Sequence, residues 1–255
     1  MKEKIDLALI CCYNNEKQLN ELLLESYNEQ NVECEKILID NSNNKFSSAA
    51  KALNYGASIS KSNYYIFLHQ DIKFLDSSSL KNIYEELIKC DGILGVAGVK
   101  ENEKKVFTSI LHGKNKEIAG KGKIDKKEEV VTVDECLFGM SKTIYEKIKF
   151  DEQTCDNWHF YAVDLCLSAS EQNIKSYIVP VNIWHASIGC KNKSFYNSLQ
   201  KMKEKYKGKR QYIKSCCIRA DVNKPKYYTI IRDYLGMRYG KIKKMLSLQR
   251  YNSNS

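Results

Sequence analysis

The fold is decided by the stretch Tyr64-Tyr65-Ile66-Phe67-Leu68-His69-Gln70-Asp71-Ile72-Lys73-Phe74. It begins with an almost unbroken aromatic and β-branched run, and residues 65–68 are apolar on both faces. This pattern predicts a strand of a parallel sheet that is covered by helices on each side. In open α/β sheets, ligands bind beyond the carboxyl ends of such strands, so His69 and Asp71 are predicted to lie in a site. A simple surface turn is the alternative.

The length and composition are enough for one large domain or for a domain with an appendage. The chain has 255 residues, 43% of them hydrophobic, and ten cysteines at mostly apolar positions without a Cys-x-x-Cys pair. These cysteines are interpreted as small buried apolar residues in a reducing compartment. The apolar run after Asp6 ends at Cys12, too short for a secretory signal, and no run approaches the length of a membrane span. A cytoplasmic location is expected.

The formal net charge is +10, and basic residues gather in the range 191–255. This asymmetry permits nucleic acid, an anionic membrane or an acidic ligand as partner. A solvated helical face is the alternative for any one cluster. The lysines and arginine concerned are Lys191, Lys193, Lys201, Lys203, Lys205, Lys207, Lys209, Arg210, Lys241, Lys243 and Lys244.

Strands and helices are predicted to alternate along most of the chain, which favours an α/β fold with a mostly parallel sheet and right-handed crossovers. From the hydrophobic periodicity, strands are expected at 6–12, 34–40, 64–68, 93–99 and 177–179, and helices at 16–27, 47–60, 79–89 and 160–171.

The remaining segments divide into an excursion and a basic end. Residues 100–127 are polar and contain glycines, so they are interpreted as a variable excursion that could cover a substrate. Strands at 129–133 and 136–140 and a short helix at 143–148 follow. Basic amphipathic helices are predicted at 195–206, 212–218 and 230–248. We therefore expect a domain at 1–190 and a basic helical C-terminal extension at 191–255.

A series of short motifs in this order resembles family 2 glycosyltransferases of the GT-A fold, over roughly residues 5 to 190. The His-Gln-Asp form at 69–71 and the Trp-His-Phe-Tyr form at 158–161 resemble a bacterial branch near the streptomycin-cluster type glycosyltransferases. The motifs are Tyr13-Asn14-Asn15-Glu16, Asp40-Asn41-Ser42, Asn54-Tyr55-Gly56, His69-Gln70-Asp71, Phe150-Asp151-Glu152, Asp164-Leu165-Cys166-Leu167 and Trp184-His185.

The resemblance implies an enzyme that transfers a hexosyl or N-acetylhexosaminyl group from a nucleoside diphosphate donor, usually a UDP-sugar, with inversion. The acceptor would be a glycan, a lipid-linked sugar or a protein, in surface polysaccharide synthesis or protein glycosylation. Asp71 and His185 are implied as metal ligands. The implied nucleotide-binding residues are Tyr13, Asn15, Glu16, Asp40, Asn54, Gly56, His69 and Gln70.

Two positions depart from the family pattern. The first carboxylate of the Asp-x-Asp metal motif is His69 here, and imidazole ligands favour Mn²⁺ over Mg²⁺. The Glu-Asp pair that often supplies the catalytic base is replaced by Tyr161 and Ala162. The usual position of the base is therefore empty.

The chemistry of sugar transfer still requires a cation to stabilise the diphosphate leaving group and a general base for the acceptor hydroxyl. Asp164, within the second turn of its predicted helix, is our hypothesis for the base because a helix N-terminus keeps a carboxylate ionised. Asp156 and His159 are the substitutes, and packing in an aromatic cluster is the alternative for His159.

Four further residues are weaker candidates for contact with the acceptor. They are Asp134, Glu135, Trp158 and Trp184. A turn is the alternative for the acidic pair, and core packing is the alternative for Trp184.

Three other functions compete with sugar transfer. A sugar-nucleotide pyrophosphorylase should carry a glycine-rich phosphate loop after the first strand, and Tyr13-Asn14-Asn15-Glu16 is no such loop. A nucleic-acid-binding module would use the basic charge, but it does not explain the motif series. Docking of the basic end on an anionic membrane is the third. Sugar transfer requires Asp71 and His185 to share one cation.

Overall fold

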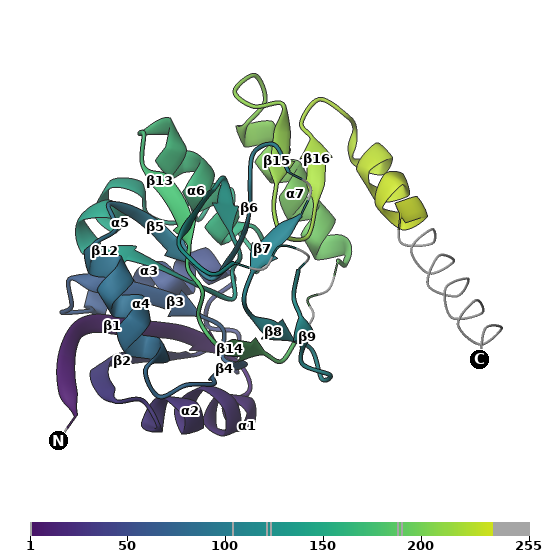
Figure 1. Ribbon diagram of the computed structural model, residues 1–255. Helices are drawn as coiled ribbons and strands as arrows, with labels where there is room; N and C mark the ends of the chain where they lie inside the picture. The colour runs from purple at the N-terminus through teal and green to yellow at the C-terminus, as the bar shows by residue number, and fades with distance from the viewer. Residues whose placement is uncertain are drawn as a thin grey trace, which may run out of the picture.

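The computed structural model describes residues 2–103, 105–120, 122, 124–187, 189 and 191–236 (Figure 1). Its centre is a seven-stranded sheet with the order β10-β13-β5-β12-β3-β1-β2. The strands are β1 (Glu3–Tyr13), β2 (Val32–Asp40), β3 (Tyr64–Leu68), β5 (Gly92–Gly95), β10 (Glu128–Val130), β12 (Leu137–Ser141) and β13 (Lys175–Ile178).

The sheet is mixed, whereas the sequence predicted a mostly parallel one. Strand β1 pairs in parallel with β2 and β3, and β5 pairs in parallel with β13. Strand β12 is antiparallel to both β3 and β5, and β10 is antiparallel to β13. The reversal follows from the long excursion before β12, because the chain returns to the sheet at the carboxyl end of β3, where the backbone N–H of His69 bonds the carbonyl of Cys136.

Helices cover both faces of the sheet, as the apolar stretch of β3 predicts. Tyr65 and Phe67 point into one buried cluster with helices α3 (Ala49–Ile59), α5 (Lys142–Ile148) and α6 (Tyr161–Glu171). Ile66 and Leu68 point into the other cluster, with α4 (Ser79–Ile88) and the helical segment after β1. That segment consists of α1 (Glu16–Gln18), a π-helical turn (Leu19–Leu24) and α2 (Glu25–Asn28). The alternation of side chains along a strand explains the two cores.

Two small sheets each include strands from the excursion at 100–127. Strand β6 (Ala97–Val99) pairs with β7 (Val106–Thr108) and β11 (Thr132–Val133). The other sheet has the order β4-β14-β8-β9, from Ile72–Phe74, Ile183–His185, Leu111–His112 and Glu117–Ile118. Its β4 follows Asp71 directly, so this sheet lies at the carboxyl end of β3.

The C-terminal part is less helical and less separate than predicted. Helix α7 (Lys193–Lys205) packs into the same buried cluster as α6. Residues 212–218 were predicted as a helix, but they belong to a hairpin of β15 (Tyr212–Lys214) and β16 (Arg219–Asp221). A helix at 226–236 follows, and the rest of the helix predicted to residue 248, with Lys241, Lys243 and Lys244, lies outside the described residues.

All cysteines in the described part of the chain are free thiols. Most are buried, in agreement with their interpretation as small apolar residues, but Cys217 is exposed. Within the described ranges, no helix combines the length and apolar character needed to cross a bilayer.

Candidate metal and nucleotide site

The carboxyl ends of three strands meet at one edge of the central sheet. Tyr13 ends β1 and Asp40 ends β2, and the two residues are paired in register. Strand β3 ends at Leu68, and His69 follows it directly. The sequence predicted this edge to hold the ligand site.

Three side chains converge beyond β3. The ligand atoms of His69, Asp71 and His185 all lie within 4.8 Å of one another. His69 Nδ1 lies 3.2 Å from His185 Nε2, and the same Nε2 lies 3.3 Å from Asp71 Oδ1. His185 reaches this position because β14 pairs with β4, which places His185 opposite Ile72. The predicted convergence of Asp71 and His185 is present, and His69, which was assigned to the nucleotide, joins them.

The electrostatics favour the ligating form of His69 and Asp71, and they favour a proton on His185 that a cation would displace. Burial lowers the pKa of His69 to about 4, and the charge of His185 adds to this effect, so the His69 imidazole is neutral. Burial alone would raise the pKa of Asp71, but hydrogen bonding and charge from His185 hold it below its ordinary value. Burial alone would lower the pKa of His185, and the bond to Asp71 raises it instead. A cation would replace the proton shared by His185 and Asp71.

The donor set fits a divalent transition metal. Two imidazole nitrogens and one carboxylate suit Mn²⁺, Fe²⁺ or Zn²⁺ better than Mg²⁺, which prefers oxygen ligands. The backbone N–H of Ser187 donates to Asp71 Oδ2 at 3.1 Å and so orients the carboxylate. His69, Asp71 and His185 are therefore the residues that would hold a metal.

His69, Asp71 and His185 are here called the metal group. A cleft of about 410 Å³ lies next to it. Tyr13, His69, Gln70, Asp71 and Trp158 were predicted as site residues and line it. The sequence missed further polar lining residues, which are Asn14, Gln18, Asn41, Asn44 and Ser187. Asn14 and Asn41 belong to the quoted motifs, so their amides could have been chosen with their neighbours.

Gln70 braces one wall of the cleft. Its Oε1 accepts hydrogen bonds from the backbone N–H groups of Asn14 and Asn15, each at 3.0 Å. Its Nε2 donates to the side-chain oxygens of Asn14 and Gln18. The loop after β1 is thus tied to the loop after β3, and both border the same space.

Three predicted nucleotide residues lie at the margin of the cleft. Asn15 caps α1 by accepting a hydrogen bond from the backbone N–H of Gln18. Glu16 is exposed in the first turn of that helix. Asp40 is exposed at the end of β2 and accepts a hydrogen bond from the backbone N–H of Ser42, which lowers the pKa of its carboxyl. None of the three is among the residues that line the cleft, although Asp40 precedes Asn41, which is.

Asn54 and Gly56 have packing roles instead of the predicted nucleotide roles. The Asn54 amide bonds the hydroxyl of Tyr145 at 2.6 Å and both backbone groups of Phe150. Gly56 lies under the sheet, where an added Cβ would be 2.6 Å from Ile10 Cγ2. These contacts join α3 to its neighbours, and they use the polar atoms that a ligand would need.

Asp164 is not placed to act as a general base, which corrects our hypothesis. Its side chain is 2% exposed, and it forms an ion pair with Lys205 at 2.8 Å and a hydrogen bond with Tyr206 at 2.9 Å. Burial raises its pKa, and the charge of Lys205 opposes that rise. Because α7 covers this carboxylate, it binds α6 to α7 and cannot reach an acceptor.

The two substitutes are also engaged elsewhere. Asp156 forms an exposed ion pair with Lys201. The ring of His159 packs edge-on against Phe195 at 5.5 Å between centroids, and burial lowers its pKa. The aromatic-cluster alternative for His159 therefore agrees with the structure.

Asp134 and Glu135 are acidic neighbours in the chain, and Asp134 acts on the metal group through its charge. Asp134 is half-buried, and its charge acts on both His69 and His185. Burial and the neighbouring Asp134 raise the pKa of Glu135 to about 8, against hydrogen bonds from the backbone N–H groups of Phe160 and Tyr161. Glu135 Oε1 is buried and has no hydrogen-bond partner among the described residues. Contact of this acidic pair with an acceptor stays a prediction.

The two tryptophans have different surroundings. Trp158 is exposed and lines the 410 Å³ cleft. Trp184 donates from its indole to the carbonyl of Gly113 at 2.8 Å, and the Lys116 ammonium lies over its ring. Trp184 thus holds the β8–β9 turn, which borders an open hollow of about 840 Å³ that also includes His112. Because Ser187 borders both spaces, the hollow adjoins the cleft.

A solved structure shares this fold. A structure of GalNAc-T7 with UDP, GalNAc and Mn²⁺ aligns with a TM-score of 0.53 at 10% identity, covering 79% of this chain and 49% of that one. A mannosyltransferase from Pyrobaculum calidifontis, in complex with GDP-Man and Mn²⁺, has a TM-score of 0.48 at 11% identity, covering 78% of this chain and 61% of that one. The architecture is the GT-A fold.

Sequence comparison gives a relative and a family. The protein named ATP synthase subunits region ORF 6 from Fuscovulum blasticum is 25% identical over 154 residues, which are 58% of this chain and 61% of that protein. The chain thus spans less than two thirds of the length of this relative. The model described as "Glycosyltransferase like family" matches residues 8–212, and the chain therefore belongs to that family.

Proposed function

We propose that this protein transfers a hexosyl or N-acetylhexosaminyl group from a nucleoside diphosphate donor, with UDP as the nucleotide, to a glycan, lipid-linked or protein acceptor. The observation that carries the proposal is the convergence of His69, Asp71 and His185 at the wall of the 410 Å³ cleft. A cleft of this size beside a metal group suits a nucleoside diphosphate, because a cation would neutralise the charge of its phosphates.

The residues divide the work of binding. Tyr13 and the asparagine side chains on the loops after β1 and β2 would contact the base and ribose, because they line the cleft. His69, Asp71 and His185 would hold a divalent metal, and Mn²⁺ is favoured over Mg²⁺ by the two imidazoles. When bound, this metal stabilises the negative charge of the diphosphate as it leaves the sugar.

Asp134 is our candidate for the general base in an inverting reaction. It stands between the metal group and the Ser215–Cys217 turn, and it contributes charge at both histidines. Its Oδ1 accepts a hydrogen bond from the backbone N–H of Cys136 at 3.0 Å, which fixes the carboxylate. A carboxylate here would accept the proton of an acceptor hydroxyl. The free thiols suit a reducing compartment, so we place the reaction in the cytoplasm.

The experiment is a nucleotide panel with and without Mn²⁺, read by calorimetry on the full chain. We expect UDP to bind, with affinity that rises at least about tenfold with Mn²⁺. Asp71→Asn should abolish the Mn²⁺ effect, while Asp156→Asn, at an exposed ion pair, is the matched control and should preserve it. Failure of every nucleoside diphosphate to bind in the presence of Mn²⁺ would refute the proposal.

The base is tested separately. Asp134→Asn should reduce transfer by about a hundredfold or more and leave UDP affinity unchanged. Normal turnover in that variant would remove Asp134 from the mechanism without touching the donor site.

A further inference from the structure

The helix at residues 226–236, here called the C-terminal helix, presents an apolar face to solvent. The exposed fractions are 67% for Tyr227, 54% for Ile231 and 58% for Leu235, and Tyr228 is also exposed. Spacings of three, four and seven residues bring these side chains to one side of a helix. Single exposed apolar residues are ordinary, but a continuous row on one face marks an interaction surface.

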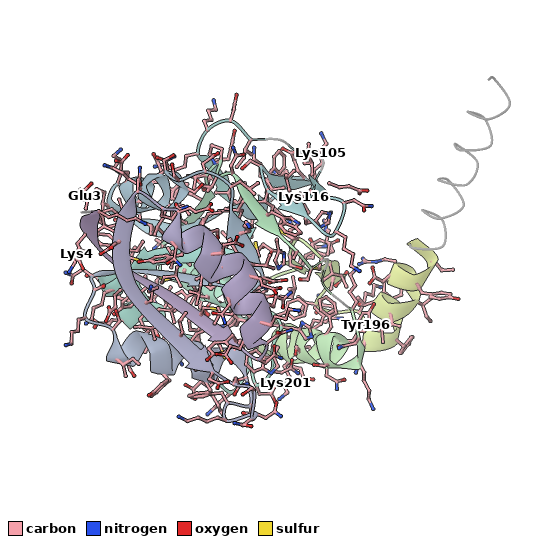
Figure 2. The ribbon with its side chains drawn as sticks, turned by 90° about the horizontal axis from the view of Figure 1, so that it is seen from below. Glu3, Lys4, Lys105, Lys116, Tyr196 and Lys201 are labelled. Carbon is pink, nitrogen blue, oxygen red and sulfur yellow. The ribbon has the colours of Figure 1, made fainter. Side chains whose placement is uncertain are left out.

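The other side of this helix is anchored to the protein. Asp233 accepts hydrogen bonds from Lys191 Nζ at 2.9 Å and from the hydroxyl of Tyr196 at 2.8 Å. Thr229 is buried on the same side. Figure 2 shows Tyr196 where α7 meets the C-terminal helix, and Figure 1 shows that helix at the periphery of the molecule. The anchoring directs the apolar face outward.

From Val222 onward, the charged residues of the sequence are almost all basic. From Val222 to the C-terminus the sequence has one acidic residue, Asp233, whose carboxylate is already paired with Lys191. Lys224 and Arg232 are exposed beside the face. The eight basic residues of this range are Lys224, Lys226, Arg232, Arg238, Lys241, Lys243, Lys244 and Arg250.

We propose that the C-terminal helix docks on the surface of a bilayer that contains anionic phospholipids. Its apolar face would enter the boundary between headgroups and acyl chains, and the basic residues would contact lipid phosphates. A second copy of the chain fits less well, because pairing two such faces would bring like charges together. Nucleic acid would use the basic residues, but the aliphatic Ile231 and Leu235 would remain exposed to water.

Docking would also orient the transferase site. Lys191, which holds the helix through Asp233, lies six residues after the metal-site residue His185 in the sequence. The site would then face a membrane that carries lipid-linked acceptors. This last step rests on the proposed function, whereas binding to the bilayer does not.

The test is cosedimentation of the full chain with vesicles of phosphatidylcholine containing about 30% phosphatidylglycerol, compared with phosphatidylcholine alone. Binding is expected only to the anionic vesicles and should weaken in high salt. The double variant Ile231→Ser with Leu235→Ser should lower the partition coefficient by about tenfold or more. The matched control is Ile59→Ser with Ile88→Ser, at two residues that are also exposed but lie elsewhere, and it should bind as the wild type.

Several results would overturn the proposal. Equal loss in both double variants would show a general effect of surface apolarity, and equal binding to neutral vesicles would remove the role of charge. A dimer in analytical ultracentrifugation that the Ile231 and Leu235 substitutions dissociate would assign the face to a second copy. Binding to single-stranded RNA with no vesicle binding would assign the surface to nucleic acid.

Folding and catalysis are controlled in the same material. Circular dichroism and the melting temperature report whether each variant is folded, and the single variant Tyr227→Ser, at the most exposed position, provides a milder test. UDP binding with Mn²⁺ should be unchanged in all of these variants. Loss of vesicle binding with intact UDP binding separates failure of docking from failure of the transferase proposal.

Discussion

The hydroxyl oxygen of Tyr161 lies 2.9 Å from Nε2 of His69 and links helix α6 to the metal group. The same hydroxyl donates to the carbonyl of Glu135 at 3.4 Å, so it accepts the Nε2 proton of His69. This assignment leaves the lone pair on His69 Nδ1, the atom that faces His185. Tyr161, which stands where the family often has a carboxylate, thus selects the tautomer that a metal ligand needs.

Tyr161→Phe is therefore expected to lower the affinity for Mn²⁺ by about tenfold, because second-shell partners orient ligating imidazoles. Binding of Mn²⁺ alone, measured by electron paramagnetic resonance, checks this. The control is Tyr145→Phe, which removes another buried hydroxyl, one that bonds Asn54. Equal Mn²⁺ affinity in Tyr161→Phe and wild type would contradict the assigned role.

Asp164→Asn should affect stability and leave the chemistry intact. The substitution removes the charge that pairs with Lys205 across α6 and α7, and we expect a loss of about 2 kcal/mol in the free energy of unfolding, because Asp151 still pairs with Lys205. Urea unfolding measures this loss. Asp156→Asn, at an exposed pair, should cost less than about 1 kcal/mol. A collapse of turnover in folded Asp164→Asn enzyme would restore Asp164 as the base.

The sequence predicted the elements whose periodicity is local. Burial on both faces gives β3 its apolar run, and burial on one face gives α4 its helical spacing of apolar residues. Both patterns are visible in the sequence, and both elements are present. Residues 212–218 were misassigned because the turn of the hairpin has no glycine or proline. It is made by the Ser215 hydroxyl, which accepts hydrogen bonds from the backbone N–H groups of Cys217 and Ile218.

The sequence predicted only those site residues whose place is set by a strand end or by strand pairing. Asp71 and His185 could be named from motifs, and their meeting follows from the pairing of β14 with β4. The contact of His69 with Tyr161, and the pairing of Asp164 with Lys205, join residues far apart in the chain. No periodic pattern encodes such contacts, so a carboxylate near a predicted helix N-terminus could not be recognised as structural.

The raised pKa of Glu135 predicts a pH-dependent stability. Burial lifts its pKa from 4.5 to about 8, so the folded state binds a proton that the unfolded state releases. The free energy of unfolding should therefore fall as pH rises from about 4.5 through about 8. Below about 4.5 the contribution of the neutral Glu135 carboxyl should be fully present. Glu135→Gln should be stabilised relative to wild type at pH above about 8, by up to a few kcal/mol, and should show little difference at pH below about 4.5.

Urea unfolding of both proteins across this pH range checks the expectation. Equal pH profiles for Glu135→Gln and wild type would mean that the carboxyl is not desolvated. The same scan on Asp134→Asn serves as the control for the neighbouring charge, because Asp134 contributes to the raised pKa of Glu135.

Gly56→Ala separates packing from a nucleotide role at this motif position. A Cβ at Gly56 would lie 2.6 Å from Ile10 Cγ2 and 2.8 Å from Ile39 Cδ1, so α3 would be pushed off the sheet. Overpacking of this kind costs about 1–3 kcal/mol, and alanine regains about 1 kcal/mol of helix propensity. We expect a net loss of about 1 kcal/mol in urea unfolding, with unchanged UDP affinity in calorimetry. Gly236→Ala, where the added Cβ meets no atom of the described part of the chain within 4 Å, should cost nothing. Weaker UDP binding in Gly56→Ala at unchanged stability would instead place this glycine beneath the donor.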